Sequence, residues 1–429
     1  MRSQWLDRRT VALLALILVS FRILPAYAAE PIRLAMIEAF SGPFANTGEA
    51  VARNLLFAIE RVNARGGVKL AGGARLLQLE MFDSKGQVEE ASTMLRRATD
   101  ARIPFVLQGN SSAVAAALID GVNKHNERAP AERVLFLNYS AVDPALTNER
   151  CSPWHFRFDA HVEMRMAALV EALAADVTVS KVYLLNQDYS FGRQVATNAR
   201  AMLAQRAKQV SVVGDELHPV GKVRDFAPYV AKIRDSGADT VVTGNWGNDL
   251  TLLVRAAREG GLTANFYTFY GNGLGAPATI GDAGVGRVHA VAEWHPNAAP
   301  PSMERVYQEF RQRFPDARND FFQARTIVMI EMLVRAIEAA GTDEALAVAR
   351  VLSGVSFDAA QGNPLGAVSM RATDHQLIGP LIVSVMDRQG APGVRYDVEG
   401  SGYGFRSRLT VKPAQNERPT RCVMAWPMR

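Results

Sequence analysis

A regular alternation of two hydrophobic patterns constrains this chain more than any other feature. Short apolar runs typical of buried strands alternate with longer stretches in which apolar residues recur every three or four positions, as on one face of a helix. In the first third of the sequence these patterns predict strands at 32–40, 76–82, 104–107 and 134–138, and helices at 48–65, 88–99 and 111–125. Short connections between such units imply parallel strands in one sheet, with helices on both of its faces.

The same alternation begins again after residue 160. It predicts helices at 161–175, 192–206, 225–236 and 249–259, and strands at 181–185, 210–213, 240–243 and 266–269. A strand at 288–293, helices at 303–314, 321–340 and 344–352, and a strand at 377–386 follow. A chain of 429 residues also exceeds the usual size of a single core. We therefore predict an α/β fold of two doubly wound parallel-sheet lobes of similar size.

The N-terminus has the pattern of a targeting segment. Three arginines precede an apolar run at 11–24, and an A-x-A cleavage site follows at Ala26 and Ala28. This pattern predicts a secretory signal peptide over residues 1–28. The alternative is an uncleaved membrane anchor, which needs about 20 apolar residues. The run is shorter than that and contains Arg22, so we expect cleavage and export.

Removal of the predicted signal peptide lowers the net positive charge of the chain. The whole chain has a formal net charge of +5, but the predicted signal peptide holds four arginines and one aspartate, which leaves +2 on the mature chain. Basic and acidic residues alternate along that chain without blocks, so no basic stripe is available for phosphate contacts. We therefore expect no nucleic-acid partner. A hydrophobic content of 48% also excludes a disordered chain.

The two cysteines, Cys151 and Cys422, would lie in an oxidising compartment after export. In such a compartment an even pair favours a disulfide over a catalytic thiol. The alternative is a pair of buried free thiols.

Motifs of catalysis are missing from the sequence. No G-x-S-x-G elbow, P-loop or H-E-x-x-H motif occurs, and the seven histidines are scattered without thiols or carboxylates at metal-ligand spacing. We therefore expect neither a metal site nor a cofactor, and no enzyme activity. The alternative, a secreted α/β hydrolase or transferase, requires a nucleophile and a base that we cannot assemble.

The loops that follow the predicted strands suggest binding instead, because ligands of parallel sheets lie at the carboxyl ends of the strands. Ser111 stands where a helix begins, so its hydroxyl and the free amides there could hold a carboxylate at the positive end of the helix dipole. Alternatively, Ser111 only caps the helix. Tyr189, Trp246 and Tyr270 stand beside glycines, which predicts exposed loop tips, although each could belong to the core.

At these loops the sequence resembles a known family, the periplasmic substrate-binding proteins of branched-chain amino acid ABC transporters. The resemblance spans Ile32 to about Met386. It is carried by short motifs in a specific order: Ser41-Gly42-Pro43 with Gly48, 62–67 (VNARGG), Asp83-Ser84, 143–147 (DPALT), 188–192 (DYSFG) and 371–376 (RATDHQ). Cys151 and Cys422 also look like a pair seen in some members.

The resemblance implies a type I periplasmic binding protein, in which two lobes joined by a three-segment hinge close on a ligand. The implied lobes are residues 29–152 with about 294–365, and residues 153–293 with about 366–429. The hinge crossings would fall near 152–157, 293–297 and 363–371. The implied function is delivery of the ligand to the membrane permease of an ABC importer, by a monomer in the periplasm. A periplasmic ligand sensor with the same fold is the alternative.

The resemblance also implies which residues bind the ligand. The candidates are Thr47, Asn110, Ser111, Ser112, Ser140, Ala141, Val142, Tyr189, Phe191, Trp246 and Tyr270. Ser111 and the 140–142 segment would hold the ligand carboxylate with Thr47 alongside, and Phe191 and Trp246 would cover the ligand from the second lobe.

Two positions depart from the family's pattern. The family uses a hydroxyl residue where this chain has Val142, and an acid for the ligand's ammonium where this chain has Tyr270. An ammonium buried without a counter-charge is costly. Either the ligand lacks an amine, or Glu38 or Asp188 supplies the charge. We therefore expect a branched-chain amino acid or a related small carboxylate with an apolar or aromatic body.

Overall fold

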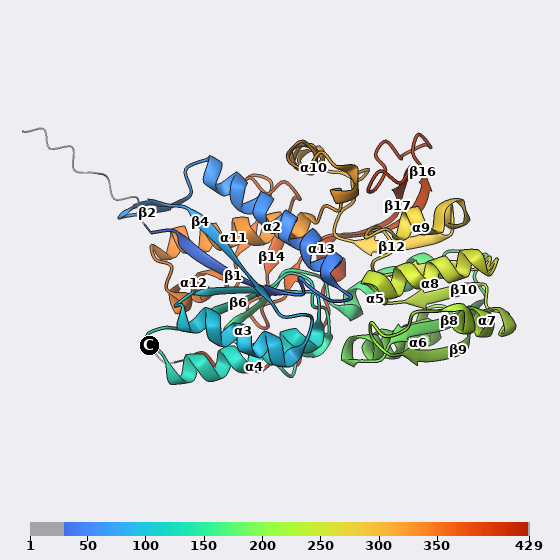
Figure 1. Ribbon diagram of the computed structural model, residues 1–429, viewed down its shortest axis with the longest axis horizontal. Coiled ribbons are helices and arrows are strands. Elements are labelled where there is room, and N and C mark those ends of the chain that lie inside the picture. Colours follow the sequence, from blue (N-terminus) through green and yellow to red (C-terminus); the bar gives the residue numbers. More distant parts are fainter. Residues whose placement is uncertain (1–29, 428–429) are drawn as a thin grey trace, which may run out of the picture. The chain divides into compact units, whose positions relative to one another are not determined.

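The computed structural model describes residues 30–427 and has the predicted α/β architecture, with two separate parallel sheets covered by helices (Figure 1). The predicted signal peptide, residues 1–28, lies outside the described residues. Across residues 30–427 no helix is both long enough and apolar enough to span a bilayer.

The first sheet consists of five parallel strands in the order β4-β1-β5-β6-β7. Their bounds are β4 Leu77–Asp83, β1 Ile32–Glu38, β5 Phe105–Gln108, β6 Leu135–Asn138 and β7 His155–Arg157. One face is covered by α3 (Val88–Asp100) and α4 (Ser112–Arg128), and the other by α2 (Ala45–Ala64), α11 (Ala324–Ala340) and α12 (Ala345–Leu352) (Figure 1). Because both faces are covered, β5 and β6 are buried at every position, which explains their continuous rather than alternating apolar sequence.

The second sheet has the order β17-β16-β12-β11-β10-β8-β9. Its parallel strands are β12 Val288–Ala292, β11 Asn265–Thr268, β10 Thr240–Thr243, β8 Lys181–Gln187 and β9 Ser211–His218. β16 (Leu381–Arg388) and β17 (Tyr403–Val411) extend the sheet antiparallel. One core lies under α5 (Val162–Ala174) and α6 (Ser190–Arg206), and another under α7 (Ala227–Asp235), α8 (Gly247–Glu259) and α9 (Ala276–Ile280). We call the first sheet with its helices lobe 1 and the second lobe 2.

The predicted strand at 377–386 is wrong in one respect, because the structure divides it at Gly379-Pro380. β15 (Leu377–Ile378) belongs to a small antiparallel sheet with β13 (Ser356–Phe357) and β14 (Val368–Met370), and β16 begins afterwards in lobe 2. Proline has no backbone N–H to donate to a sheet, so a strand interior does not accommodate it. A hairpin of β2 (Val68–Leu70) and β3 (Gly73–Arg75), which the sequence did not predict, precedes β4.

The sheets shift two of the predicted lobe boundaries. β7 pairs with β6, so residues 155–157 belong to lobe 1, whereas the boundary predicted at residue 152 placed them in lobe 2. Val368 and Met370 pack in the core of lobe 1, although the second boundary at about 365 placed them in lobe 2. Between these crossings, α10 (Pro301–Arg313) returns the chain to the core of lobe 1 after β12. The remaining predicted lobe boundaries stay a prediction.

The predicted bridge between Cys151 and Cys422 is confirmed. The two residues form a disulfide across 271 positions of sequence. Cys151 precedes β7 of lobe 1, and Cys422 follows β17 of lobe 2. The C-terminal tail therefore runs back from lobe 2 and is covalently attached to lobe 1.

Candidate functional site

The loops at the carboxyl ends of strands from both lobes line a cavity of about 40 Å³. All the residues that the sequence predicted to bind ligand line it: Thr47, Asn110, Ser111, Ser112, Ser140, Ala141, Val142, Tyr189, Phe191, Trp246 and Tyr270. Lobe 1 contributes mainly small and hydroxylated residues, and lobe 2 contributes aromatic ones. The tertiary structure thus brings together side chains that are up to 223 positions apart in sequence.

The lobe 1 wall contains the N-terminus of α4, a helix of 17 residues with no acidic residue in its first turn. Ser111 caps this helix, since its Oγ accepts from the backbone N–H of Val114 at 3.4 Å. Ser112 Oγ accepts from the backbone N–H of Asp143 at 3.2 Å, which leaves the Ser112 hydroxyl hydrogen available as a donor. The cap uses the Val114 amide and leaves the earlier amides of the first turn for an anion, so the two roles of Ser111 are compatible.

The lobe 2 wall is formed by aromatic side chains at the starts of two helices. Tyr189 and Trp246 are the residues that precede α6 and α8, and Trp246 Nε1 donates to Tyr189 Oη at 2.9 Å. Trp246 also packs against Phe44 of lobe 1 with ring centroids 4.3 Å apart. Burial raises the pKa of Tyr189 well above its usual value, so its phenol is neutral.

These aromatics are not the exposed loop tips that neighbouring glycines predicted. Trp246 is 9% exposed and belongs to the core of lobe 2, and Tyr189 and Tyr270 are partly buried against that core. Gly247 shows why a buried position can require a glycine. Its φ is +58°, and an added Cβ would lie 3.0 Å from Phe44. The glycine here allows two aromatic walls to approach each other.

Neither acid proposed as a partner for an ammonium reaches the cavity. Glu38 is 2% exposed and accepts hydrogen bonds from the backbone N–H groups of Gly109 and Asn110, at 3.3 and 3.1 Å, and from the hydroxyl of Tyr139. Burial raises the pKa of Glu38, although these hydrogen bonds oppose the rise. Its carboxyl group therefore holds the loop that carries Asn110 and does not face a ligand.

Asp188 lies at the surface. Its Oδ1 accepts from Arg193 Nη2 at 2.7 Å, and the side chains of both residues are more than two-fifths exposed. It is absent from the lining of the cavity. The charge of Asp188 is thus paired outside the site.

Five lining residues were missed by the sequence analysis: Gly109, Leu274, Phe321, Gln323 and Arg325. Most follow no recognisable motif. Arg325 did leave a signal, because it lies in the first turn of α11, where the positive end of the helix dipole disfavours a cation. Nearby carboxylates would offset the charge of a cation in this position.

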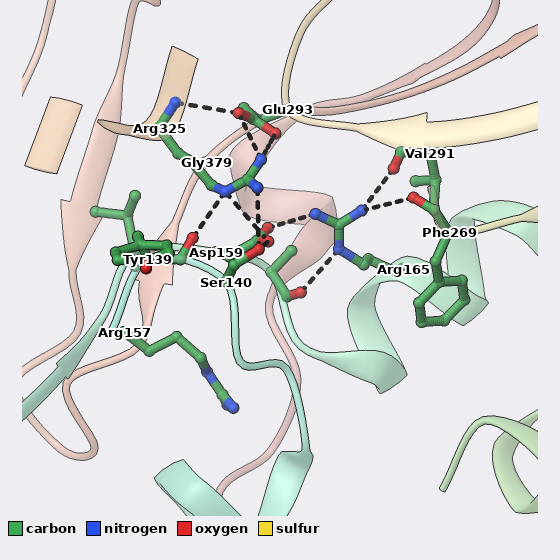
Figure 2. Close-up of polar contacts among 12 residues, drawn as sticks. Tyr139, Ser140, Arg157, Asp159, Arg165, Phe269, Val291, Glu293, Arg325 and Gly379 are labelled. Carbon is green, nitrogen blue, oxygen red and sulfur yellow. Dashed lines mark hydrogen bonds and ion pairs between the residues drawn. The ribbon is translucent and has the colours of Figure 1, made fainter. Parts of the chain in front are cut away.

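Arg325 indeed belongs to a buried ionic network (Figure 2). Its Nη1 lies 3.1 Å from Glu293 Oε1, and its Nε lies 3.4 Å from Asp159 Oδ2. Asp159 Oδ1 in turn accepts from Arg165 Nη2 at 2.5 Å. Burial alone would lower the pKa of Arg325, but Glu293 and Asp159 more than offset that effect and raise it. Arg325 therefore stays charged.

The network joins the cavity to the segments that connect the lobes. Arg325 Nη2 donates to Ser140 Oγ at 3.0 Å and its Nε donates to the Tyr139 carbonyl at 2.7 Å, both beside the cavity. Asp159 follows β7 and Glu293 follows β12, so each lies where the chain passes between lobes. Cavity-lining residues and the connections between the lobes thus share one set of hydrogen bonds.

The third connection is tied to the first by Arg157 and Gln376. Arg157 Nε donates to Gln376 Oε1 at 2.6 Å, and Gln376 Nε2 donates to the carbonyl of Asp159 at 2.9 Å. Arg157 lies apart from the Arg325 group in Figure 2, and its Nη1 donates to the carbonyl of Asp143 at 2.6 Å. All three connections are therefore held together by buried hydrogen bonds.

The site offers hydrogen-bond donors and apolar walls rather than reacting groups. Within residues 30–427, no three histidine, cysteine, aspartate or glutamate side chains are grouped as a metal would require. The arrangement suits recognition of a small molecule with one polar end and one apolar end.

A family model described as periplasmic binding protein matches residues 31–391 of the chain. Among curated relatives, the Leu/Ile/Val-binding protein homolog 4 of Brucella abortus (strain 2308) is 31% identical over 410 residues, 93% of this chain and 94% of that protein. The Leu/Ile/Val-binding protein homolog 7 of the same organism is 24% identical over 360 residues, 81% of this chain and 87% of that protein.

Solved structures agree in fold. The leucine-, isoleucine-, valine-, threonine- and alanine-binding protein of Brucella ovis in its closed conformation has a TM-score of 0.80 and 28% identity, and the match covers 93% of this chain and all of that one. An ABC-transporter solute-binding protein of R. palustris in complex with 4-hydroxybenzoate has a TM-score of 0.74 at 18% identity, with 89% of this chain and 97% of that chain covered.

Proposed function

The chain belongs to the periplasmic binding protein family, and we propose that it carries a small carboxylate between its lobes to the permease of an ABC importer. Members of the family bind solutes and are not enzymes. The observation that supports a carboxylate is the cavity itself, in which the N-terminus of α4 with Ser111 and Ser112 faces Tyr189, Phe191 and Trp246. The helix terminus suits an anion, and the aromatic wall suits an apolar or aromatic body.

The size of the cavity supports binding by hinge closure. A volume of about 40 Å³ is far below that of an ordinary ligand pocket, which is about 300–1,000 Å³. The lobes also touch at Asn248, whose Nδ2 donates to the carbonyl of Pro43 at 2.7 Å. A ligand of amino-acid size therefore requires the lobes to part before it enters and to close over it afterwards.

Calorimetry of the mature protein, freed of any co-purified ligand, tests this function. We expect binding to branched-chain or aromatic carboxylates, with or without an amine, and a fall in the radius of gyration by small-angle X-ray scattering when the ligand is added. Sugars and cationic peptides serve as controls with the wrong chemistry. Binding to those alone would contradict the proposed function.

Location and assembly follow from the same proposal. The family that matches is one of periplasmic binding proteins, which supports a periplasmic location for this protein. Export through a signal peptide at 1–28 predicts an N-terminus at residue 29, which N-terminal sequencing of the exported protein checks. We further propose that the protein is a monomer with no nucleic-acid partner.

A further inference from the structure

The formal charge at the cavity is positive. Among the described residues that line it, Arg325 carries a formal charge, and the others present hydroxyl, amide, aromatic or aliphatic groups. The Arg325 side chain is 8% exposed and its Nη2 bonds Ser140 Oγ at 3.0 Å, so the guanidinium lies directly behind a lining hydroxyl. A cationic group on the ligand would meet a cation of the protein there.

The carboxylates bonded to Arg325 are already occupied. Asp159 is held by Arg165 at 2.5 Å and by Arg325 at 3.4 Å, and its side chain is 1% exposed. Glu293 is held by Arg325 at 3.1 Å. Two arginines thus share two acids, and an ammonium entering the cavity would be a third cation competing for them (Figure 2). Separating these buried pairs is costly.

The remaining polar groups of the cavity are neutral. Gln323 is 5% exposed, and its Oε1 has no hydrogen-bond partner in the described protein. Burial raises the pKa of Tyr270 to about 12, so its phenol is uncharged. Both side chains can hydrogen-bond a hydroxyl or carbonyl of a ligand, but neither supplies the counter-charge that an enclosed ammonium needs.

An anionic ligand would not compete with the arginines for these acids. The first turn of α4 presents unpaired amides and the Ser112 hydroxyl, and it contains no acidic side chain. We infer that the site selects carboxylates that lack an α-ammonium group over the amino acids with the same side chain. This inference rests on the proposed function, because it assumes that the carboxylate binds in this cavity.

Matched pairs of ligands test the selectivity by calorimetry. The pairs are 4-methylpentanoate with leucine and 3-phenylpropanoate with phenylalanine, whose members differ only by the ammonium. In each pair that binds, we expect the amine-free acid to have a Kd at least about tenfold lower, equivalent to about 1.4 kcal/mol. Equal or tighter binding of the amino acid overturns the inference and leaves the proposed function standing. If no small carboxylate binds, the proposed function fails and the inference fails with it.

A change at Gln323 provides a second measurement with a matched control. Gln323→Glu keeps the shape of the side chain and adds the missing negative charge, so the preference within each pair is expected to move about tenfold toward the amino acid. Gln323→Met removes the amide without adding charge and should leave the preference within about threefold of wild type. A preference that is the same in Gln323→Glu as in Gln323→Met contradicts the inference, provided that circular dichroism shows both variants folded.

Discussion

Arg325 contacts several buried polar groups at once. Its guanidinium contacts Glu293, Asp159, the Tyr139 carbonyl and Ser140 Oγ. Removing one partner of a buried ionic network leaves the others without a counter-charge, which costs more than the network contributes when intact. The residue therefore matters for stability as well as for the site.

We expect Arg325→Met to lower the free energy of unfolding by about 3–5 kcal/mol, because Glu293 would lose its arginine partner. Urea denaturation followed by circular dichroism measures the change. Arg150→Met is the control, since the Arg150 and Asp120 side chains are about half exposed and their pair at 3.0 Å should contribute less than about 1 kcal/mol. Similar losses in the two variants would show that burial of the network is unimportant.

Asp320 is a second buried acid with a measurable consequence. Its Oδ2 accepts from the hydroxyl of Tyr307 at 2.6 Å and lies 3.5 Å from Arg311 Nε, and burial raises its pKa from 3.8 to about 7. The folded protein thus holds this proton more tightly than the unfolded chain does. The stability that Asp320 contributes is complete below pH 3.8 and is lost as the pH rises through about 7.

Replacing Asp320 by asparagine should remove this dependence on pH. Relative to wild type, the free energy of unfolding of Asp320→Asn is expected to lose less between pH 4.5 and pH 7.5. Denaturation series across that range give both slopes. Identical slopes would mean that another group accounts for the pH dependence.

Among the helices and strands, α4 links helix stability to the candidate site. Ser111 caps the helix, and the same first turn faces the cavity. A cap hydroxyl and a bound anion both satisfy amides that the helix leaves unpaired. Stability and ligand affinity should therefore respond differently to different substitutions at this residue.

Ser111→Ala is expected to lower the free energy of unfolding by about 1 kcal/mol, because the cap is lost. Ser111→Asp keeps a capping oxygen and should preserve stability, but its negative charge would weaken binding of a carboxylate by about tenfold or more. Thermal unfolding and calorimetry on both variants separate the two effects. Unchanged carboxylate affinity in Ser111→Asp would exclude the α4 terminus as the anion site.

At the scale of the whole molecule, the C-terminal tail adds a covalent link between the lobes. After β17 of lobe 2, the carbonyl of Arg418 accepts from Arg371 Nη1 at 2.6 Å, and Cys422 is bonded to Cys151 of lobe 1. The disulfide closes 271 positions of chain and limits the conformations that the unfolded protein can reach.

Breaking this bond should lower the free energy of unfolding by about 2–5 kcal/mol. Cys422→Ser, compared with wild type in urea without reductant, measures the effect. The Cys151→Ser, Cys422→Ser double variant should match the single variant, because either change removes the same bond. A mass increase on reduction and alkylation of wild type verifies that the bond is present in the purified protein.

The α/β class and the two lobes followed from local patterns in the sequence. The eleven candidate binding residues followed from the resemblance to a known family, and all of them line the cavity. Period and run length distinguish helices from strands, and the carboxyl ends of parallel strands are where ligand loops occur. The even pair of cysteines in an exported chain likewise pointed to the bridge that the structure contains.

Which charges lie at the cavity depends on how the chain folds in three dimensions. Glu38 ends β1 and Asp188 directly follows β8, so both were reasonable candidates, yet Glu38 bonds backbone amides and Asp188 bonds a surface arginine. Arg325 comes from a helix far along the chain, and its partners Asp159 and Glu293 come from two different connections between the lobes. Electrostatic interactions depend on distance and burial in three dimensions, and neither quantity is encoded in the local pattern of a sequence.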